Sequence, residues 1–422
     1  MESTTSPRRY ANGILTRNRL LDAASELFAN DGFRAVSLRD IAAEAGVSHA
    51  GLLRHFASKE AILTCLIDRF DNVNEHWEAE RTHATEHPTA TDVLDIAARN
   101  LRVPGAVELL TSLAGEATSP QHPAHDYMRE RYRRARAATA LAVPDAMPTA
   151  PESTTSTATR FLALWDGLHI QHLYDPEAVD VVEGLADHLG ATPPQRRRAP
   201  SSPRSTTRAG DLNALPRDAG YAATQERRAS IVDGAVILFA RQGFHNTSLA
   251  AIAEYAGVPK SSLLRYFPTK EHLLTAVLVA RDDHGLASAR AQSWSAREHF
   301  AKIIESARTA VEAEPGLIAF FTVLTGEALA PEHPGHDYIR FRYRRARSYF
   351  TALFAEAADE GLLAPGRDPA REATNFLAMW DGLQIQWLYD PEDIDIPGAL
   401  SAHLHTVFTL RALPAQPERD EQ

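Results

Sequence analysis

The chain of 422 residues has almost no cysteine and no long apolar run. Its single Cys65 has no partner for a disulfide, which excludes the disulfide-rich secreted scaffolds and agrees with a reducing compartment. Cys65 lies in a helical pattern beside Leu63 and Ile67, so we expect a packed thiol rather than a reactive one. No apolar segment approaches the roughly 20 residues that span a bilayer, and residues 1–9 lack the apolar centre of a signal peptide. These absences predict a cytoplasmic protein.

Alternating apolar and polar runs, which indicate β-strands, are also nearly absent. Ala, Leu, Arg and Glu predominate, which favours helix, and 422 residues exceed one ordinary core and fit two or more domains. The net charge of −11 argues by itself against a nucleic-acid partner. The charge is uneven, however, because residues 226–282 are slightly basic and residues 1–71 are close to neutral. Since a local basic surface matters more than the total, DNA is not excluded.

The sequence contains two copies of one pattern. At a shift of 211 residues, His-Pro-Ala-His-Asp-Tyr at 122–127 aligns with His-Pro-Gly-His-Asp-Tyr at 333–338. Further along, the shift becomes 215 and pairs Leu-Trp-Asp-Gly-Leu at 164–168 with Met-Trp-Asp-Gly-Leu at 379–383. A repeat of this length indicates a duplicated domain rather than a solenoid.

Residues 191–222, between the copies, are rich in Pro, Ser and Arg, and this composition predicts a flexible linker. Each copy opens with a pattern of helix, turn and helix. After an opening helix, Ser37 and Ser248 are suited to cap a short second helix. Gly46 and Gly257 end this second helix, just before a third helix with a buried apolar stripe. This spacing is typical of a helix-turn-helix. The residues left on the outward face of the third helix are Ser48, His49, Ala50, Leu53 and Arg54, and in the second copy Pro259, Lys260, Ser261, Leu264 and Arg265.

These two units resemble the TetR family of bacterial transcription regulators. The resemblance rests on Leu-Phe…Gly-Phe, Ser-Leu…Ile-Ala, Ala-Gly-Val, the Phe of the third helix and the Ser/Thr-Lys-Glu at 58–60 and 269–271. It covers residues 16–71 and 226–282, and the remainder of each copy more loosely. It implies a sequence-specific DNA-binding regulator, usually a ligand-responsive repressor, without enzymatic activity or cofactor. The fold it implies is all-α, in two tandem copies, each a helix-turn-helix domain followed by a helical ligand-binding and dimerisation domain. The expected segments are 12–71 (DNA-binding domain of copy 1), 72–190 (regulatory domain of copy 1), 191–222 (linker), 223–282 (DNA-binding domain of copy 2) and 283–412 (regulatory domain of copy 2).

A recognition helix lies in the major groove with its first residues at base edges. We therefore expect His49 and Lys260 to read bases, with lysine the stronger donor to guanine. Arg54 and Arg265 are expected to hold either a phosphate or a base. The resemblance adds phosphate contacts from the residue before the buried Phe and from the lysine that opens the fourth helix. The complete set expected at DNA is Ser48, His49, Ala50, Arg54, His55 and Lys59, with Lys260, Ser261, Ser262, Arg265, Tyr266 and Lys270.

Leu53 and Leu264 stand where the family commonly has a tyrosine that contacts phosphate. Leucine cannot donate a hydrogen bond, so it either packs, which we favour, or meets a thymine methyl group. The two recognition helices also differ on their outward faces, which predicts an operator whose halves, about one helical turn or more apart, are not a strict palindrome. In an alternative, one copy has lost DNA binding; this would concern the first, with His49 in place of a fixed charge and Ala57 where the second has Pro268.

The resemblance also implies a small-molecule pocket among the middle helices and a four-helix bundle formed by the last two helices of two subunits. Because both partners are present in one chain, we expect an intramolecular pseudo-dimer joined through residues 161–190 and 376–411; pairing of two chains is the alternative. For each expected pocket residue, a place in the core is the competing interpretation. Those residues are Tyr127, Trp165 and His169 in the first copy and Phe320, Tyr338, Trp380 and Gln384 in the second, and the His169/Gln384 difference predicts unequal pockets.

A second function class is a metal-dependent hydrolase that uses the His-Pro-x-His-Asp segments at 122–126 and 333–337. Such an enzyme needs further ligands on other helices, and the sequence offers no such set. Because proline after histidine indicates a loop and the Asp-Tyr that follows indicates a helix start, we favour a structural role for both segments and expect no metal.

Overall fold

The computed structural model describes residues 7–81, 89–103, 105–146, 154–191, 222–278 and 294–409. These residues form helices, with one isolated β-bridge between Leu363 and Phe408 and no strand. The predicted all-α fold is therefore confirmed. In this part of the chain, no helix combines the length and the apolar character needed to cross a membrane. The predicted linker lies outside the described residues except for its end residues, 191 and 222.

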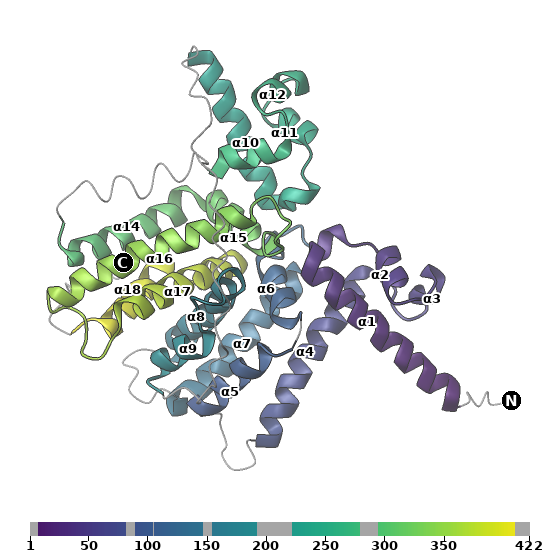
Figure 1. The fold of residues 1–422 in the computed structure, drawn as a ribbon, viewed down its shortest axis with the longest axis horizontal. Helices are drawn as coiled ribbons and strands as arrows, with labels where there is room; N and C mark the ends of the chain where they lie inside the picture. Colours follow the sequence, from purple (N-terminus) through teal and green to yellow (C-terminus); the bar gives the residue numbers. More distant parts are fainter. Residues whose placement is uncertain are drawn as a thin grey trace.

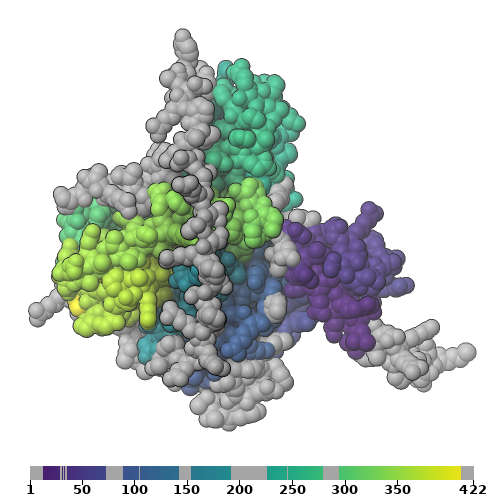
Figure 2. All heavy atoms as spheres, in the orientation of Figure 1, coloured from purple at the N-terminus to yellow at the C-terminus, as the bar shows by residue number. Residues whose placement is uncertain are grey.

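The two copies have the same order of elements. The first contains α1 (Pro7–Ala35), α2 (Leu38–Glu44), α3 (His49–Leu53), α4 (Lys59–Arg81), α5 (Ala90–Asn100), α6 (Ala106–Glu116), α7 (His125–Ala146), α8 (Thr154–Tyr174) and α9 (Val181–Leu189). The second contains α10 (Ala222–Asn246), α11 (Leu249–Tyr255), α12 (Lys260–Tyr266), helical residues 270–278, α14 (Ala296–Ala313), α15 (Pro315–Glu327), α16 (His336–Asp359), α17 (Pro369–Tyr389) and α18 (Ile396–Val407). Figure 1 shows α1 to α3 and α10 to α12 projecting from a central body of helices, and Figure 2 shows them as two separate lobes.

The turn of each helix-turn-helix forms as its sequence predicts. The Ser37 hydroxyl accepts a hydrogen bond from the Asp40 backbone N–H, and the Asp40 carboxylate accepts one from the Ser37 N–H, which makes a capping box at the start of α2. Ser248 caps α11 through the N–H of Ala251. Gly46 and Gly257 both have φ of +66°, a conformation that side chains disfavour, so glycine is required at both turns. The N-caps and turn glycines are thus confirmed.

The helices α8 and α17 cross in close contact at the centre of the body. A Cβ atom on Gly167 would overlap the backbone of Ala378, and one on Gly382 would overlap the backbone of Ala163. Each glycine belongs to a Trp-Asp-Gly segment, and the same contact is made once from each copy. The repeated glycine is therefore explained by the approach of two helix backbones.

Polar contacts across this crossing also occur in pairs. Gln386 Nε2 donates to the carbonyl oxygen of Thr159 at 3.0 Å, and Gln171 Nε2, at the matching position, donates to that of Thr374 at 3.4 Å. At the ends of the same helices, the hydroxyl of Tyr174 donates to the Thr325 carbonyl at 2.7 Å. Its counterpart Tyr389 donates to the Ala114 carbonyl at 3.0 Å.

Ion pairs connect the copies in the same reciprocal way. Asp390 is buried and accepts from Arg133 at 2.7 Å and from Arg136. The guanidinium groups hold the pKa of Asp390 below its usual value, although burial of the carboxyl opposes them. In the opposite direction, Asp175 accepts from Arg344 at 3.1 Å and from Arg347 at 2.6 Å. Matching ion pairs therefore occur in both directions between the copies.

Candidate nucleic-acid interface and ligand cavities

The outward faces of α3 and α12 are exposed over the residues that the sequence predicts. They are Ser48, His49, Ala50, Leu53 and Arg54, and Pro259, Lys260, Ser261, Leu264 and Arg265. Figure 1 places α3 and α12 on the parts of the two lobes that face away from the body. Both helices thus leave their outward faces open to a partner.

Ser48 is the N-cap residue of α3, a structural role that the sequence analysis did not assign. Its hydroxyl accepts a hydrogen bond from the backbone N–H of Gly51 at 3.0 Å and so caps α3. The hydroxyl hydrogen remains available as a donor. At the matching position, Pro259 makes no side-chain cap, so the first turn of α12 begins without one.

The packing role favoured for Leu53 and Leu264 is wrong. Their side chains are 45% and 38% exposed, respectively, whereas Leu52 and Leu263 beside them are fully buried. Helical periodicity directs one leucine of each pair into the core and the next one outward. An apolar contact outside the unit, such as a thymine methyl group, is the interpretation that agrees with this exposure.

Lys59 and Lys270 point toward the protein rather than away from it. Lys59 Nζ donates to the carbonyl oxygens of Phe33 and Val36, both at 2.7 Å, and lies 4.4 Å from the centre of the Phe33 ring. Lys270 Nζ donates to the carbonyl of Phe244 at 2.7 Å, and burial lowers its pKa. Both ammonium groups therefore hold the end of the first helix, and their contact with phosphate stays a prediction.

The remaining residues predicted to contact DNA differ in how far they are exposed. Ser262, His55 and Tyr266 are half-buried, and the Arg265 guanidinium lies 5.6 Å from the centre of the Tyr266 ring. Arg54 is exposed at the end of α3.

Arg17 and Arg228 were not identified from the sequence as part of these units. Their guanidinium groups cover Phe56 at 4.5 Å and Phe267 at 5.4 Å, respectively. The signal that could have revealed them is their equal position in the two copies, since no motif contains them.

A cavity of about 70 Å³ lies in the regulatory part of the first copy, among α6, α7 and α8. Trp165 and His169 line it, and so does Asp166, which the sequence analysis did not select. That Trp165 and His169 contact a ligand stays a prediction. The Tyr132 hydroxyl donates to the Asp166 carboxylate at 2.7 Å, and burial of the carboxyl raises its pKa to about 6. The repeated Trp-Asp-Gly was the available signal for this carboxylate.

His169 presents a hydrogen-bond acceptor to the cavity. Its Nδ1 lies 2.8 Å from the carbonyl oxygen of Trp165, and because a carbonyl only accepts, Nδ1 carries the hydrogen. Burial lowers the pKa of His169 to about 4, so the imidazole is neutral at pH 7 and Nε2 has a lone pair.

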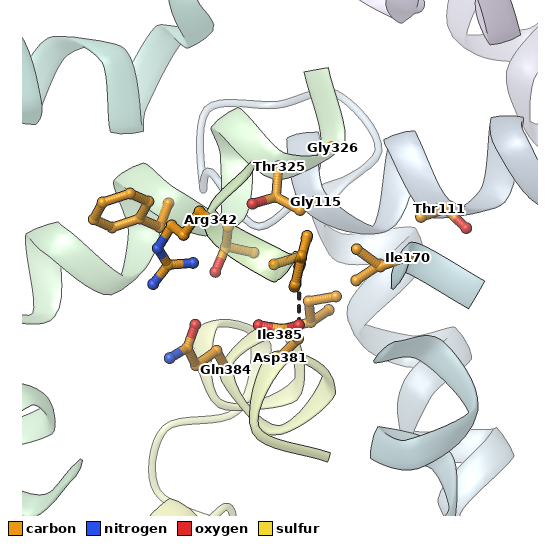
Figure 3. Close-up of a pocket in the computed structure, with 12 residues that line it drawn as sticks. Thr111, Gly115, Ile170, Thr325, Gly326, Arg342, Asp381, Gln384 and Ile385 are labelled. Atoms are coloured by element: carbon orange, nitrogen blue, oxygen red, sulfur yellow. Dashed lines mark hydrogen bonds between the residues drawn. The ribbon is translucent and has the colours of Figure 1, made fainter. Parts of the chain in front are cut away.

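The matching cavity of the second copy is only about 20 Å³. Figure 3 shows Asp381, Gln384 and Ile385 on α17, with Arg342 and Ile170 on opposite sides of the pocket. The Tyr343 hydroxyl donates to Asp381 at 2.9 Å, and burial raises the pKa of Asp381 to about 6. Gln384 lines this pocket, and its contact with a ligand stays a prediction.

The other four predicted pocket residues line neither cavity. The Tyr127 hydroxyl donates to Asp68 on α4 at 2.7 Å, and that of Tyr338 donates to the carbonyl of Leu278 at 3.3 Å. Both tyrosines therefore connect the regulatory part to the last helix of the DNA-binding unit. Phe320 is buried against the rings of Phe239 and Phe321, and Trp380 packs on the ring of Phe376. Phe320 thus occupies a core position, and Trp380 is half-buried against the core.

The His-Pro-x-His-Asp segments form loops that start α7 and α16. His122 Nδ1 accepts from the N–H of Ala124 at 3.1 Å, and His125 Nδ1 donates to the carbonyl of Ala117 at 2.9 Å. His333 and His336 repeat both bonds, with Gly335 and Ala328. Among the residues that the structure describes, no group of His, Cys, Asp and Glu has the arrangement of a metal site. The geometry agrees with the structural role favoured for these loops.

Comparison with known proteins identifies related sequences in both copies. A family described as bacterial regulatory proteins, tetR family, matches residues 20–64 and again 231–277. A second, described as BetI-type transcriptional repressor, C-terminal, matches residues 280–409.

Individual relatives cover about half of the chain or less. The HTH-type transcriptional regulator RutR of Escherichia coli is 43% identical over 81 residues, which are 19% of this chain and 36% of RutR. The HTH-type transcriptional regulator TtgR of Pseudomonas putida is 28% identical over 213 residues, 45% of this chain and 94% of TtgR. The crystal structure of NalD, the secondary repressor of the MexAB-OprM multidrug efflux pump in Pseudomonas aeruginosa, matches 43% of this chain and 94% of NalD, with 23% identity and a TM-score of 0.35.

Proposed function

The chain belongs to the TetR family of bacterial regulatory proteins and carries the DNA-binding unit of that family twice, and we propose that it is a ligand-responsive repressor in which one chain supplies both recognition helices. Residues 12–71 and 223–282 bind DNA, residues 72–190 and 283–412 form the regulatory parts, and residues 191–222 link the copies. The observation that carries this proposal is the reciprocal crossing of α8 and α17, in which contacts of the first copy recur in the second.

Reciprocity matters because a twofold interface contains every contact twice. The Gly167 to Ala378 approach has its counterpart between Gly382 and Ala163, and the pairing of Arg136 with Asp390 has its counterpart between Arg347 and Asp175. In a regulator made of two identical chains, each such pair joins one subunit to the other. In this chain both pairs are satisfied within one polypeptide, which supports a pseudo-dimer that needs no second chain.

DNA recognition is assigned to the exposed faces of α3 and α12. Lys260 donates to a guanine edge, and His49 makes a weaker contact with a base in the other half-site. Leu53 and Leu264 make apolar contacts, such as with a thymine methyl group. Arg54 and Arg265 add charge at the ends of the recognition helices. Because these faces differ, the preferred operator has unequal halves.

A ligand acts on DNA binding through the helices that connect the cavity to α4. Arg131, which lines the first cavity, donates to Asp71 at 3.0 and 2.8 Å, and Tyr127 donates to Asp68. Asp68 and Asp71 lie on α4, the helix that follows the recognition helix. A ligand therefore shifts the helix-turn-helix if it binds more tightly to the protein with α7 in one position than in another. A ligand with equal affinity for both arrangements has no effect.

The contact between α6 and α15 extends the coupling to the other copy. A Cβ atom on Gly115 would lie 2.8 Å from the carbonyl oxygen of Thr322, so the two helices touch through their backbones. Movement of α6 at the first cavity thus displaces α15, which packs against α10 of the second DNA-binding unit.

Light scattering of the protein alone and bound to a duplex operator tests the proposal. We expect one chain per operator even at nanomolar protein. Because no second chain has to assemble first, the slope of the binding curve should not become steeper as the protein is diluted. Two chains on every bound operator would contradict the pseudo-dimer. Failure to select any preferred sequence from a random DNA pool would contradict DNA binding itself.

A further inference from the structure

We propose that, of the two matching cavities among the described residues, the one in the first copy is open to a ligand, and that this cavity binds one small organic ammonium ion per chain. The inference rests on the proposed ligand response and specifies the number of ligands and their chemical class. It follows from a comparison of the residues at matching positions of the two cavities.

Larger side chains fill the second cavity. At two matching positions that line both cavities, the second copy has the bulkier residue: Phe321 for Leu110 and Thr325 for Ala114. The second cavity is about 20 Å³ against about 70 Å³ in the first. Because a buried void of this size is closed by a few methyl groups, these larger side chains reduce the volume of the second cavity.

Phe321 lines the second cavity where the first has Leu110, and its neighbours hold it in place. The ring of Phe320 meets it edge to face at 5.1 Å, and the Arg342 guanidinium lies 4.6 Å from the centre of its ring. In the first copy, the arginine at the same position is Arg131, which pairs with Asp71, and Leu110 stands in place of the ring. In the second copy the arginine lies over the aromatic ring that lines the smaller cavity.

The open cavity is suited to a cation. Asp166 contributes a carboxylate, and the positive charge of Arg131 is already matched by Asp71. His169 contributes the acceptor Nε2, and Trp165 contributes an aromatic surface, which attracts organic cations. A carboxylate ligand would face Asp166 as well as Arg131, and repulsion from Asp166 disfavours it. In the second copy, Gln384 replaces His169 and brings an amide that donates as well as accepts.

The size of the cavity limits the cation to a few non-hydrogen atoms unless the helices move apart. A suitable probe is propylammonium, with three N–H donors and a short apolar chain, and propionate is the matched anion. A probe this small binds in roughly the millimolar range. Titration of the full chain, followed by saturation of protein NMR signals or by calorimetry, gives both the affinity and the number of sites.

We expect one propylammonium site per chain and no propionate binding. Asp166→Asn weakens propylammonium binding about 10-fold or more, whereas Asp381→Asn, the same change in the second copy, leaves it unchanged. Leu110→Phe abolishes the site by giving the first cavity the residue that fills the second. Conversely, Phe321→Leu combined with Thr325→Ala opens the second cavity and raises the number of sites to two.

Several results would overturn the inference: two sites in the unaltered chain, sensitivity to Asp381→Asn, equal binding of propionate, or no binding of propylammonium. Circular dichroism of each variant establishes that it is folded; if Leu110→Phe unfolds, Asp166→Asn against Asp381→Asn still decides. Operator binding without propylammonium is measured in parallel. A chain that binds DNA but not propylammonium contradicts this inference alone, and a chain that binds no DNA contradicts the proposed function.

Discussion

His188 and His403 occupy the same position in the two copies, and their imidazole rings stack with centres 6.2 Å apart. Burial is the main reason that the pKa of His188 falls to about 3 and that of His403 falls well below its ordinary value, and nearby Arg160 and Arg367 lower both further. Glu372 also faces the pair, with its carboxylate 4.0 Å from His403 Nε2. The pair is therefore neutral in the folded protein at pH 7.

This pair predicts a loss of stability in acid. Below pH 6.5 the unfolded chain takes up protons on both histidines and the folded chain does not, so stability falls as the pH drops. Each histidine contributes about 2 kcal/mol of this loss between pH 7.5 and pH 5. Urea unfolding should show that His403→Phe removes about one such contribution. His405→Phe, an exposed position on the same helix, is the control, and an equal effect of the two substitutions would contradict the prediction.

The crossing of α8 and α17 predicts an unusual sensitivity to one methyl group. Gly167→Ala places a Cβ atom inside the backbone of Ala378 and should cost about 1–3 kcal/mol, because two packed helices must separate. Gly316→Ala adds the same methyl group where no atom lies within 4 Å, and it should be neutral or slightly stabilising. Thermal unfolding compares the two variants, and a neutral Gly167→Ala would show that the copies do not meet as described.

The inward orientation of Lys59 predicts that its removal affects folding first. Lys59→Met leaves the carbonyls of Phe33 and Val36 without this donor and should lower the free energy of unfolding by about 1–3 kcal/mol. Lys260→Met, at an exposed position, should change stability by less than about 0.5 kcal/mol. If Lys59→Met keeps full stability and loses only DNA affinity, its main task is a phosphate contact.

The recognition helices predict unequal effects on DNA binding. Lys260→Ala should weaken operator binding by about 1–3 kcal/mol and relax the preference for guanine in one half-site, since lysine is the stronger donor. His49→Ala should have a smaller effect, in the other half-site. Fluorescence anisotropy at fixed salt measures both. Arg54→Ala compared with Arg265→Ala shows whether each copy binds, because a copy that has lost DNA binding tolerates its own substitution.

The operator itself should be asymmetric. Selection of bound sequences from a random DNA pool should give two different half-sites about one helical turn or more apart. Exchange of residues 48–51 for residues 259–262, so that both copies carry the outward face of the second, should then shift the consensus toward a palindrome. A symmetric consensus from the unaltered chain would contradict the prediction.

Most of the fold was predictable because every local signal occurs twice. The caps at Ser37 and Ser248 and the turns at Gly46 and Gly257 depend on neighbouring residues alone, and the structure has them as predicted. The exposure of Leu53 followed from helical periodicity, but its unusual residue type led to the wrong expectation.

The site was less accessible to prediction because its contacts join distant segments. Lys59 meets a carbonyl 26 positions earlier, and Tyr127 meets Asp68, 59 positions away, so neither direction is visible in a motif. The difference between the cavities was present in the sequence as Leu110 against Phe321. It acquired meaning only when the structure showed that the two residues line matching cavities.

The reciprocal ion pairs have a consequence for how such a chain diverges. In a regulator of two identical subunits, one altered codon changes both symmetry-related contacts at once. Here, loss of Arg136 disturbs only the pair with Asp390 and leaves Arg347 with Asp175 intact. A single mutation therefore breaks one such contact rather than two, and one half of the molecule is free to acquire a new specificity while the other retains the old one.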